Sequence, residues 1–293
     1  MRTQRQGLVA WALALPFLAV FAVFMILPLV GSLAMSFTDM SSRDVRSPFA
    51  VNFVGLDQYA ALFADERFVQ SLLNTAYFVG VGIPITIVVG LALALTVDAG
   101  ISRVRAVFRI GFFAPVVTSI VAVAIVWRFM LQSDGIVNSM LAVVGIDGPQ
   151  WLTDPAWAMP SIIIMTVWRN AGLIMIICLA GLQAIPPELR EAASVDGAGP
   201  WTRLRRITLP LLRPTILLGA VLLTVGYLQL FEEPFVMTGG GPLGATTSVS
   251  LYVYEQFGFG DYASGAAAAY VLVVATAAIA AVWFRTLRSR VES

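Results

Sequence analysis

The chain has 293 residues, of which 59% are hydrophobic and 12% are charged, and its mean hydropathy is +0.86. Soluble domains carry about 25% charged residues, so we expect most of this chain to lie in lipid. The net charge of +1 gives no electrostatic basis for binding nucleic acid, and the absence of lysine and histidine excludes a P-loop ATPase, serine–histidine triads and HExxH zinc sites.

Six apolar segments are each long enough to cross a bilayer as a helix, which takes about 20 residues. The predicted spans are residues 8–37, 71–97, 106–131, 159–184, 213–233 and 263–284. Arg2 and Arg5 precede the first span, as in a secretory signal. Its apolar stretch is too long for a signal, however, and no small-x-small cleavage site follows. We therefore interpret it as an uncleaved span and predict an all-α integral membrane fold.

The arginines are distributed unevenly between the two sides of the predicted membrane. The two tails and the second and fourth connections carry thirteen of them, the first connection carries three, and the third and fifth carry none. Basic residues in short loops mark the cytoplasmic side, so both termini are predicted to be cytoplasmic. The opposite connections are rich in Asp and Glu, which we interpret either as solvated loop charge or as part of a docking surface for an extracytoplasmic protein.

The cytoplasmic loop between the fourth and fifth spans has the pattern of two short helices joined by a bend. Pro187 suits the first position of a helix, and Gly197 is placed to end that helix. Residues 198–209 form a second short, basic, amphipathic stretch. Pro210 and Pro214 are then expected to redirect the chain into the fifth span.

This loop, residues 186–212, contains a spaced motif: Glu191-Ala192-Ala193, three residues, Gly197, nine residues, and Ile207-x-Leu209-Pro210. The motif resembles the EAA loop of permease subunits of binding-protein-dependent ATP-binding-cassette (ABC) importers. The resemblance implies that a separate ATPase subunit binds the loop. The implied contacts are Glu191, Ala192, Ala193, Asp196 and Gly197. Without the motif, the same stretch would also suit an interfacial connection with arginines on lipid phosphates.

The same resemblance implies an architecture and a set of partners. The expected fold is the type I ABC importer permease fold, with six transmembrane helices in one domain, residues 1–293, in a bacterial inner membrane. The expected partners are a second homologous permease subunit, two ABC ATPase subunits, an extracytoplasmic substrate-binding protein and the lipid bilayer. ATP and Mg²⁺ would bind to the ATPase, so we expect no catalytic residue, metal site or cofactor in this chain. Transport would follow alternating access.

Four further segments resemble sugar-importer permeases related to the maltose permease. They are Gly55–Tyr59, Asn74-Thr75, Leu179–Pro186 and Thr238–Pro242. The resemblance implies import of a sugar or sugar derivative. Three alternatives stay open: an ABC permease for a non-sugar solute such as a phosphodiester or peptide-like compound, an ion-coupled secondary transporter using Arg169 and Glu232, and an enzyme acting on lipid-linked sugars.

Polar residues inside the spans mark the expected substrate path, because they are costly in lipid. Arg169 lies about 15 Å from the outer end of the fourth span, at roughly 1.5 Å per residue. It is expected to pair with Glu232 or Glu233, or to contact a ligand. The sugar-permease resemblance implicates Asn170, Gly172, Tyr227, Gln229 and Glu232. The maltose permease has asparagines where Gln229 and Leu230 stand, which is a departure from its pattern.

Two other segments are interpreted structurally. Pro115, Thr118 and Ser119 in the third span would either line the path or kink and pack the helix, and we favour packing. The glycines of Gly239–Pro242 are not followed by the lysine of a phosphate loop. We therefore interpret this segment as a flexible turn.

Overall fold

The computed structural model describes residues 2–46, 51–99 and 102–288. Within these ranges the chain is helical, and extended backbone pairs only in one bridge, between Thr38 and Phe53. Five helices among the described residues are long and apolar enough to span a membrane, and a bent pair of helices makes a sixth candidate. The predicted all-α membrane fold is thereby confirmed. The chain divides into two compact units, Met1–Phe68 with Tyr252–Val271 and Val69–Leu251 with Leu272–Ser293.

The first unit begins with a long apolar helical run. It consists of α1 (Arg2–Phe21), the π-helical turn η1 (Ala22–Ile26) and α2 (Leu27–Met35). A short 3-10 helix η2 (Ser42–Arg46) and α3 (Asp57–Ala64) follow. In the candidate span Leu13–Met35, no residue of the most apolar 18-residue stretch is buried by other described parts of the chain.

In the first unit, Tyr252 makes a hydrogen bond and an aromatic contact with residues 65–68, which follow α3. Its hydroxyl donates a 2.6 Å hydrogen bond to Asp65, and its ring packs 5.3 Å from that of Phe68. Burial of the phenol, followed by its bond to Asp65, raises the pKa of Tyr252 to about 12. A 2.6 Å salt bridge joins Arg67, two residues after Asp65, to Glu255, three residues after Tyr252.

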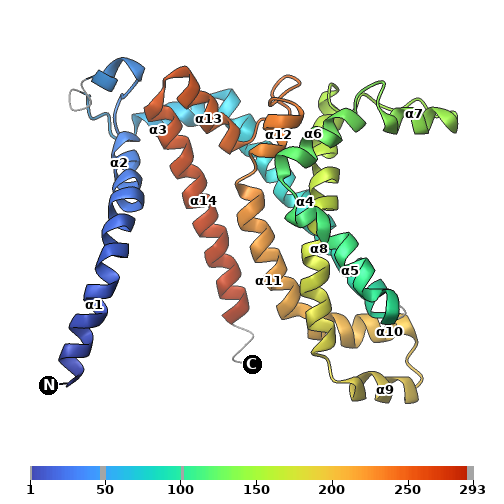
Figure 1. The fold of residues 1–293 in the computed structure, drawn as a ribbon. Helices are drawn as coiled ribbons and strands as arrows, with labels where there is room; N and C mark the ends of the chain where they lie inside the picture. The colour runs from blue at the N-terminus through green and yellow to red at the C-terminus, as the bar shows by residue number, and fades with distance from the viewer. Residues whose placement is uncertain (1, 47–50, 100–101, 289–293) are drawn as a thin grey trace. The chain divides into compact units, whose positions relative to one another are not determined.

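The second unit is a helical bundle built around α8 (Figure 1). The remaining elements of the chain are α4 (Glu66–Ala99), α5 (Ser102–Val117), α6 (Ile120–Met130), α7 (Ile136–Val143), α8 (Pro155–Gln183), α9 (Pro187–Val195), α10 (Pro200–Arg203), the π-helical turn η3 (Leu204–Thr208), α11 (Leu209–Leu228), α12 (Glu232–Met237), α13 (Val249–Phe259) and α14 (Tyr262–Arg288). Helices α5 and α11 both pack against α8, and α12 packs against α6. Most of the buried core therefore centres on α8.

Two close helix crossings on α8 occur at glycine residues, which have no side chain. A Cβ at Gly172 would collide with the backbone oxygen of Phe112 on α5. A Cβ at Gly181 would lie 2.7 Å from the hydroxyl of Thr215 on α11. Small residues let membrane helices approach closely, and these two positions set how near α5 and α11 lie to α8.

The segment predicted as the third span is broken. Helices α5 and α6 meet at 97°, with Ser119 in an extended conformation between them (φ −55°, ψ 126°). Pro115 lacks the backbone N–H that would continue the ladder, and the Thr118 hydroxyl bonds back to the carbonyl of Ala114 at 2.8 Å. These residues thus bend the helix, as one of the two sequence interpretations expected.

The entry to the fifth span differs from the prediction. Pro210 and Pro214 do not redirect the chain, because both lie in α11, which continues from α10 through η3. The wide turn η3 ends with the N–H of Leu209 bonded to the carbonyl of Leu204, five residues back. A π-type turn shifts the hydrogen-bond register, which lets a helix continue where proline donors are missing.

The glycine-rich segment after α12 is also not the flexible turn that we predicted. Thr246 and Ser248 are fully buried, and the Thr246 hydroxyl donates to the carbonyl of Gly241 at 2.8 Å. The Ser248 hydroxyl donates to the carbonyl of Leu230 at 2.5 Å. The threonine side chain therefore satisfies a carbonyl of the turn, and the serine ties the segment after the turn to Leu230, before α12.

Candidate functional site

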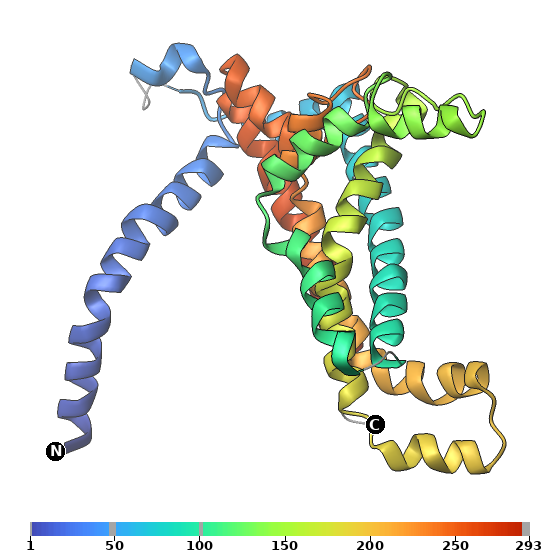
Figure 2. The ribbon, with the colours of Figure 1, turned by 45° about the vertical axis from the view of Figure 1, so that its right-hand side comes forward.

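The predicted ATPase-binding loop forms a projecting pair of helical segments. Helices α9 and α10 lie at one end of the second unit, and α6, α7 and α12 lie at the other (Figures 1 and 2). Pro186 is extended (φ −54°, ψ 130°), and Pro187 starts α9, so two prolines separate α9 from α8. The chain then reverses between Val195 and Pro200, where α10 begins.

The reversal after α9 is a hydrogen-bonded helix cap centred on Gly197. The N–H of Ala198 bonds to the carbonyl of Ala193 at 2.9 Å, and the N–H of Gly197 bonds to that of Ser194 at 3.2 Å. This pair of bonds is the Schellman motif. Gly197 has φ +74°, a conformation that other residues rarely adopt. The prediction that Gly197 ends the helix is confirmed.

Four of the five residues predicted to contact the ATPase are exposed, and one is buried. Glu191, Ala192, Asp196 and Gly197 are exposed, whereas Ala193 is buried. Apolar side chains outside the predicted contact set are also exposed on this projection, among them Val195 at 87% and Trp201 at 70%. Exposed carboxylates beside exposed apolar groups give the projection the mixed character of a protein-binding surface.

A buried polar cluster joins α4, α8 and α11 inside the second unit. The Tyr227 hydroxyl lies 2.8 Å from that of Thr86, and the side chain of Asn170 also hydrogen-bonds with Tyr227. Asn170 donates to the carbonyl of Thr166 at 3.1 Å. The structure therefore brings Asn170 and Tyr227 together, and adds Thr86, which was not among the predicted path residues.

Charged groups lie near this cluster without forming a close pair. The Nε of Arg169 is buried and has no hydrogen-bond partner. The expected salt bridge from Arg169 to Glu232 or Glu233 is not among the ion pairs of the described residues, whose one pair is Arg67–Glu255. Glu233 is 7% exposed, whereas Glu232 is exposed.

The other predicted path residues lie outside the polar cluster. Gly172 is buried at the crossing of α8 with α5, where its role is to admit the neighbouring backbone. Gln229 is exposed and follows the last residue of α11. The register of α12, which starts after a break at residues 229–231, decides which of the two consecutive glutamates is buried.

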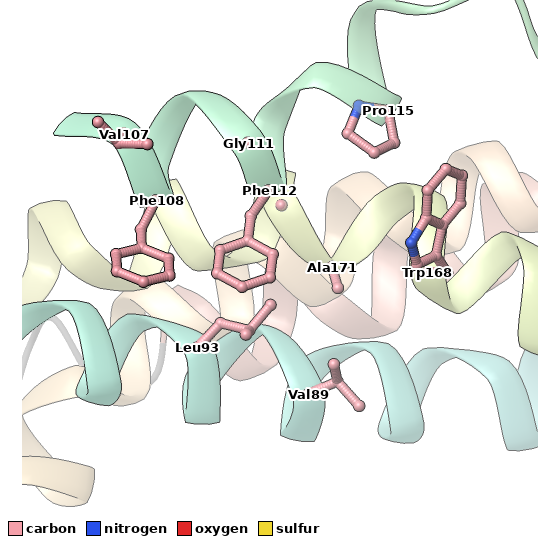
Figure 3. Close-up of a pocket in the computed structure, with 10 residues that line it drawn as sticks. Val89, Leu93, Val107, Phe108, Gly111, Phe112, Pro115, Trp168 and Ala171 are labelled. Carbon is pink, nitrogen blue, oxygen red and sulfur yellow. The ribbon is translucent and has the colours of Figure 1, made fainter. Parts of the chain in front are cut away.

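An apolar cavity of about 480 Å³ lies between α4, α5 and α8 (Figure 3). Phe108, Phe112 and Leu93 line one part of it, and Trp168 and Pro115 line another. Neither Arg169 nor Asn170 lines it. The cavity therefore suits an apolar group rather than a sugar, which needs polar partners. The described residues contain no cluster of three metal-ligating side chains.

Comparison with known proteins gives matches over nearly the whole chain. The lactose transport system permease protein LacF of Rhizobium radiobacter is 37% identical over 286 residues, covering 96% of this chain and 94% of the relative. The trehalose/maltose transport system permease protein MalF of Thermococcus litoralis is 34% identical, covering 98% and 96%. A crystal structure of a bacterial ABC transporter involved in import of the acidic polysaccharide alginate matches with a TM-score of 0.84 at 29% identity, covering 99% and 98%.

The family described as "Binding-protein-dependent transport system inner membrane component" matches residues 58–292, a range that includes the α9 projection and the polar cluster. Its members are transport subunits of the membrane rather than enzymes. The apolar helices, the EAA spacing on an exposed projection and the full-length relatives agree with this description. The chain belongs to the family of inner membrane components of binding-protein-dependent transport systems.

Proposed function

We propose that this chain is the permease subunit of an ATP-driven importer for a sugar or a sugar derivative. The observation that carries the proposal is the full-length similarity to permeases named for lactose and for trehalose and maltose. A third relative, from Agrobacterium fabrum, is named for sulfoquinovosyl glycerol and is 33% identical. The substrate would arrive on an extracytoplasmic binding protein, as in the related alginate transporter described in complex with a loaded periplasmic protein.

The α9 projection would be the contact with the ATPase. A second homologous permease and two ATPase subunits would complete the transporter, and ATP with Mg²⁺ would bind to the ATPases. Glu191, Ala192, Ala193, Asp196 and Gly197 would seat the projection, which faces the cytoplasm together with both termini. The Schellman cap supports this role because a hydrogen-bonded bend passes displacement from α9 on to α10 instead of absorbing it.

Substrate would pass beside the polar cluster of the second unit during alternating access. Asn170 and Tyr227 supply hydrogen-bonding groups and Arg169 supplies a charge with an unsatisfied donor. Gln229 and Glu232 would line the path near the end of α11, where both are exposed. Gly172 would act by positioning α5 against α8.

The test is to copurify the chain with its ATPase and measure ATP hydrolysis in proteoliposomes with the binding protein. Lactose, trehalose, maltose and alginate oligosaccharides are compared with glycerophosphodiesters and peptides. We expect one sugar class to stimulate hydrolysis and to be taken up. Stimulation only by a non-sugar solute would overturn the sugar assignment. Uptake that continues without ATP and stops when an ionophore dissipates the ion gradient would overturn the ATP-driven mechanism.

A further inference from the structure

The short helix α7 lies crosswise to α8 at the end of the second unit remote from α9, and it carries an apolar face (Figures 1 and 2). Ile136, Met140 and Val143 are 53%, 66% and 86% exposed. Their spacing of four and three residues places them on one side of a helix. No ionisable residue occurs between Asp134 and Asp147. This surface is therefore suited to a partner without charge.

The opposite side of α7 is hydrogen-bonded to the segment before it and to the loop that follows it. The Asn138 side chain donates to the carbonyl oxygens of Ser133 and Pro149 at 3.1 and 3.3 Å. It also accepts a 2.7 Å hydrogen bond from the indole N–H of Trp151. These three bonds oppose rotation of α7 about its axis, so the helix does not turn its apolar face inward.

The loop that fastens α7 leads directly into a membrane span. Helix α8 begins at Pro155, one residue after its cap Asp154. Trp151 packs edge-on against Trp157 of α8, with the ring centroids 5.2 Å apart. Tryptophan combines an apolar body with a polar N–H and collects at the membrane–water boundary. Helix α7 is thus held at the level where a span meets that boundary.

The preceding helix, α6, also carries exposed apolar side chains. Phe129, at the end of α6, is 61% exposed, and Ile125 and Val126 are 43% and 56% exposed. We propose that α7 is an interfacial helix that inserts Ile136, Met140 and Val143 into the acyl boundary of the bilayer. Because it has no basic residue, the contact is made through apolar burial and not through charged lipid headgroups.

The experiment labels α7 at single positions with an environment-sensitive fluorophore. Cys178, the one native cysteine, is replaced by alanine, and the full chain is placed in phosphatidylcholine nanodiscs. Labels are attached in V143C and M140C on the apolar face. The matched control is A142C, since Ala142 is an exposed neighbour that lines a polar hollow with Asn138 and Asp147. Quenching by nitroxide-bearing lipid is compared with quenching by iodide.

We expect nitroxide lipid to quench the labels at positions 143 and 140 several-fold more than the label at 142, and iodide to show the reverse order. Equal access of iodide to positions 143 and 142 would overturn the proposal by placing the face in water. Protection of position 143 from both quenchers would also overturn it, because a protein would then cover the face. The use of two apolar positions guards against one variant that folds poorly.

Discussion

The side-chain nitrogen of Asn74 lies 2.9 Å from the carbonyl oxygen of Thr247, 173 residues away in the sequence. The same nitrogen donates to the carbonyl of Gly244 at 2.8 Å, so both of its N–H groups are used. Thr75 extends the contact by accepting from the N–H of Val249 at 3.1 Å. The Asn74-Thr75 motif is therefore hydrogen-bonded to residues 244–249, which follow the Thr238–Pro242 motif, and Thr246 of that stretch bonds in turn to Gly241 within the motif.

We predict that Asn74→Ala lowers the thermal stability of the chain. The substitution leaves two carbonyl oxygens without their partner, and each buried unsatisfied group costs about 1–3 kcal/mol. Unfolding followed by tryptophan fluorescence in detergent measures the effect. The control is Gln70→Ala, which removes one partly buried hydrogen bond from the exposed residue Gln70 to Asn74 on the same helix. Equal melting temperatures for the two variants would contradict the importance of the Asn74 bonds.

Tyr227→Phe is expected to weaken the polar cluster and slow substrate uptake. It removes the hydroxyl shared with Thr86 and Asn170, and a net loss of about 1 kcal/mol is typical of one buried hydrogen bond. The stability of the variant and its uptake of the stimulating sugar are measured together. Tyr77→Phe is the matched control, because Tyr77 is 45% exposed on α4. Uptake equal to that of the unmodified protein would remove Tyr227 from the proposed path.

The membrane fold could be predicted because long apolar segments in lipid have few alternatives to helix. The end of α9 could also be predicted, since Gly197 supplies the positive φ that its cap requires. The bend at Ser119 could not be predicted in direction or size from Pro115 alone. A proline removes one donor, but the neighbouring helices decide how far the chain then turns.

The polar cluster shows a different limit of sequence reasoning. Glu232 and Glu233 are adjacent and chemically identical, and only the register of α12 buries one and exposes the other. Thr86 lies in an apolar span, and its hydroxyl already bonds to the carbonyl of Gly82 at 2.7 Å. A threonine with this helical bond looks purely structural in a sequence. Its contact with Tyr227 depends on how α4 packs against α11.

Stability is expected to fall at high pH through Tyr252. Its pKa is raised from 10.0 to about 12, first by burial and then by its bond to Asp65. A raised pKa means that folding favours the neutral phenol, so this contribution is complete below pH 10 and disappears as the pH rises through 12. Melting temperatures between pH 9 and 12 measure the loss, with Tyr252→Phe as the comparison. If the melting temperature of Tyr252→Phe fell with pH as much as that of the unmodified chain, groups other than Tyr252 would cause the loss of stability.

The last prediction concerns the bend after α9, where the effect of backbone conformation can be separated from the effect of side-chain size. Gly197 has φ +74° with nothing within 4 Å of an added Cβ, so a side chain there meets backbone strain but no steric clash. For an L-residue this conformation costs about 1–2 kcal/mol, and asparagine tolerates it best. We therefore expect Gly197→Val to reduce substrate-stimulated ATP hydrolysis of the assembled transporter strongly, and Gly197→Asn to retain most of it.

Gly199→Ala provides the control for bulk in the same loop. Gly199 has an ordinary φ of −62° and also has open space around its Cβ position, so this change should leave hydrolysis and assembly unaltered. Membrane insertion is measured in parallel, because the strain lies outside the spans and should leave insertion intact. If Gly197→Val and Gly199→Ala gave the same ATP hydrolysis, the bend would not require a residue with positive φ at position 197. A rigid cap at Gly197 would then no longer support force transfer from the ATPase.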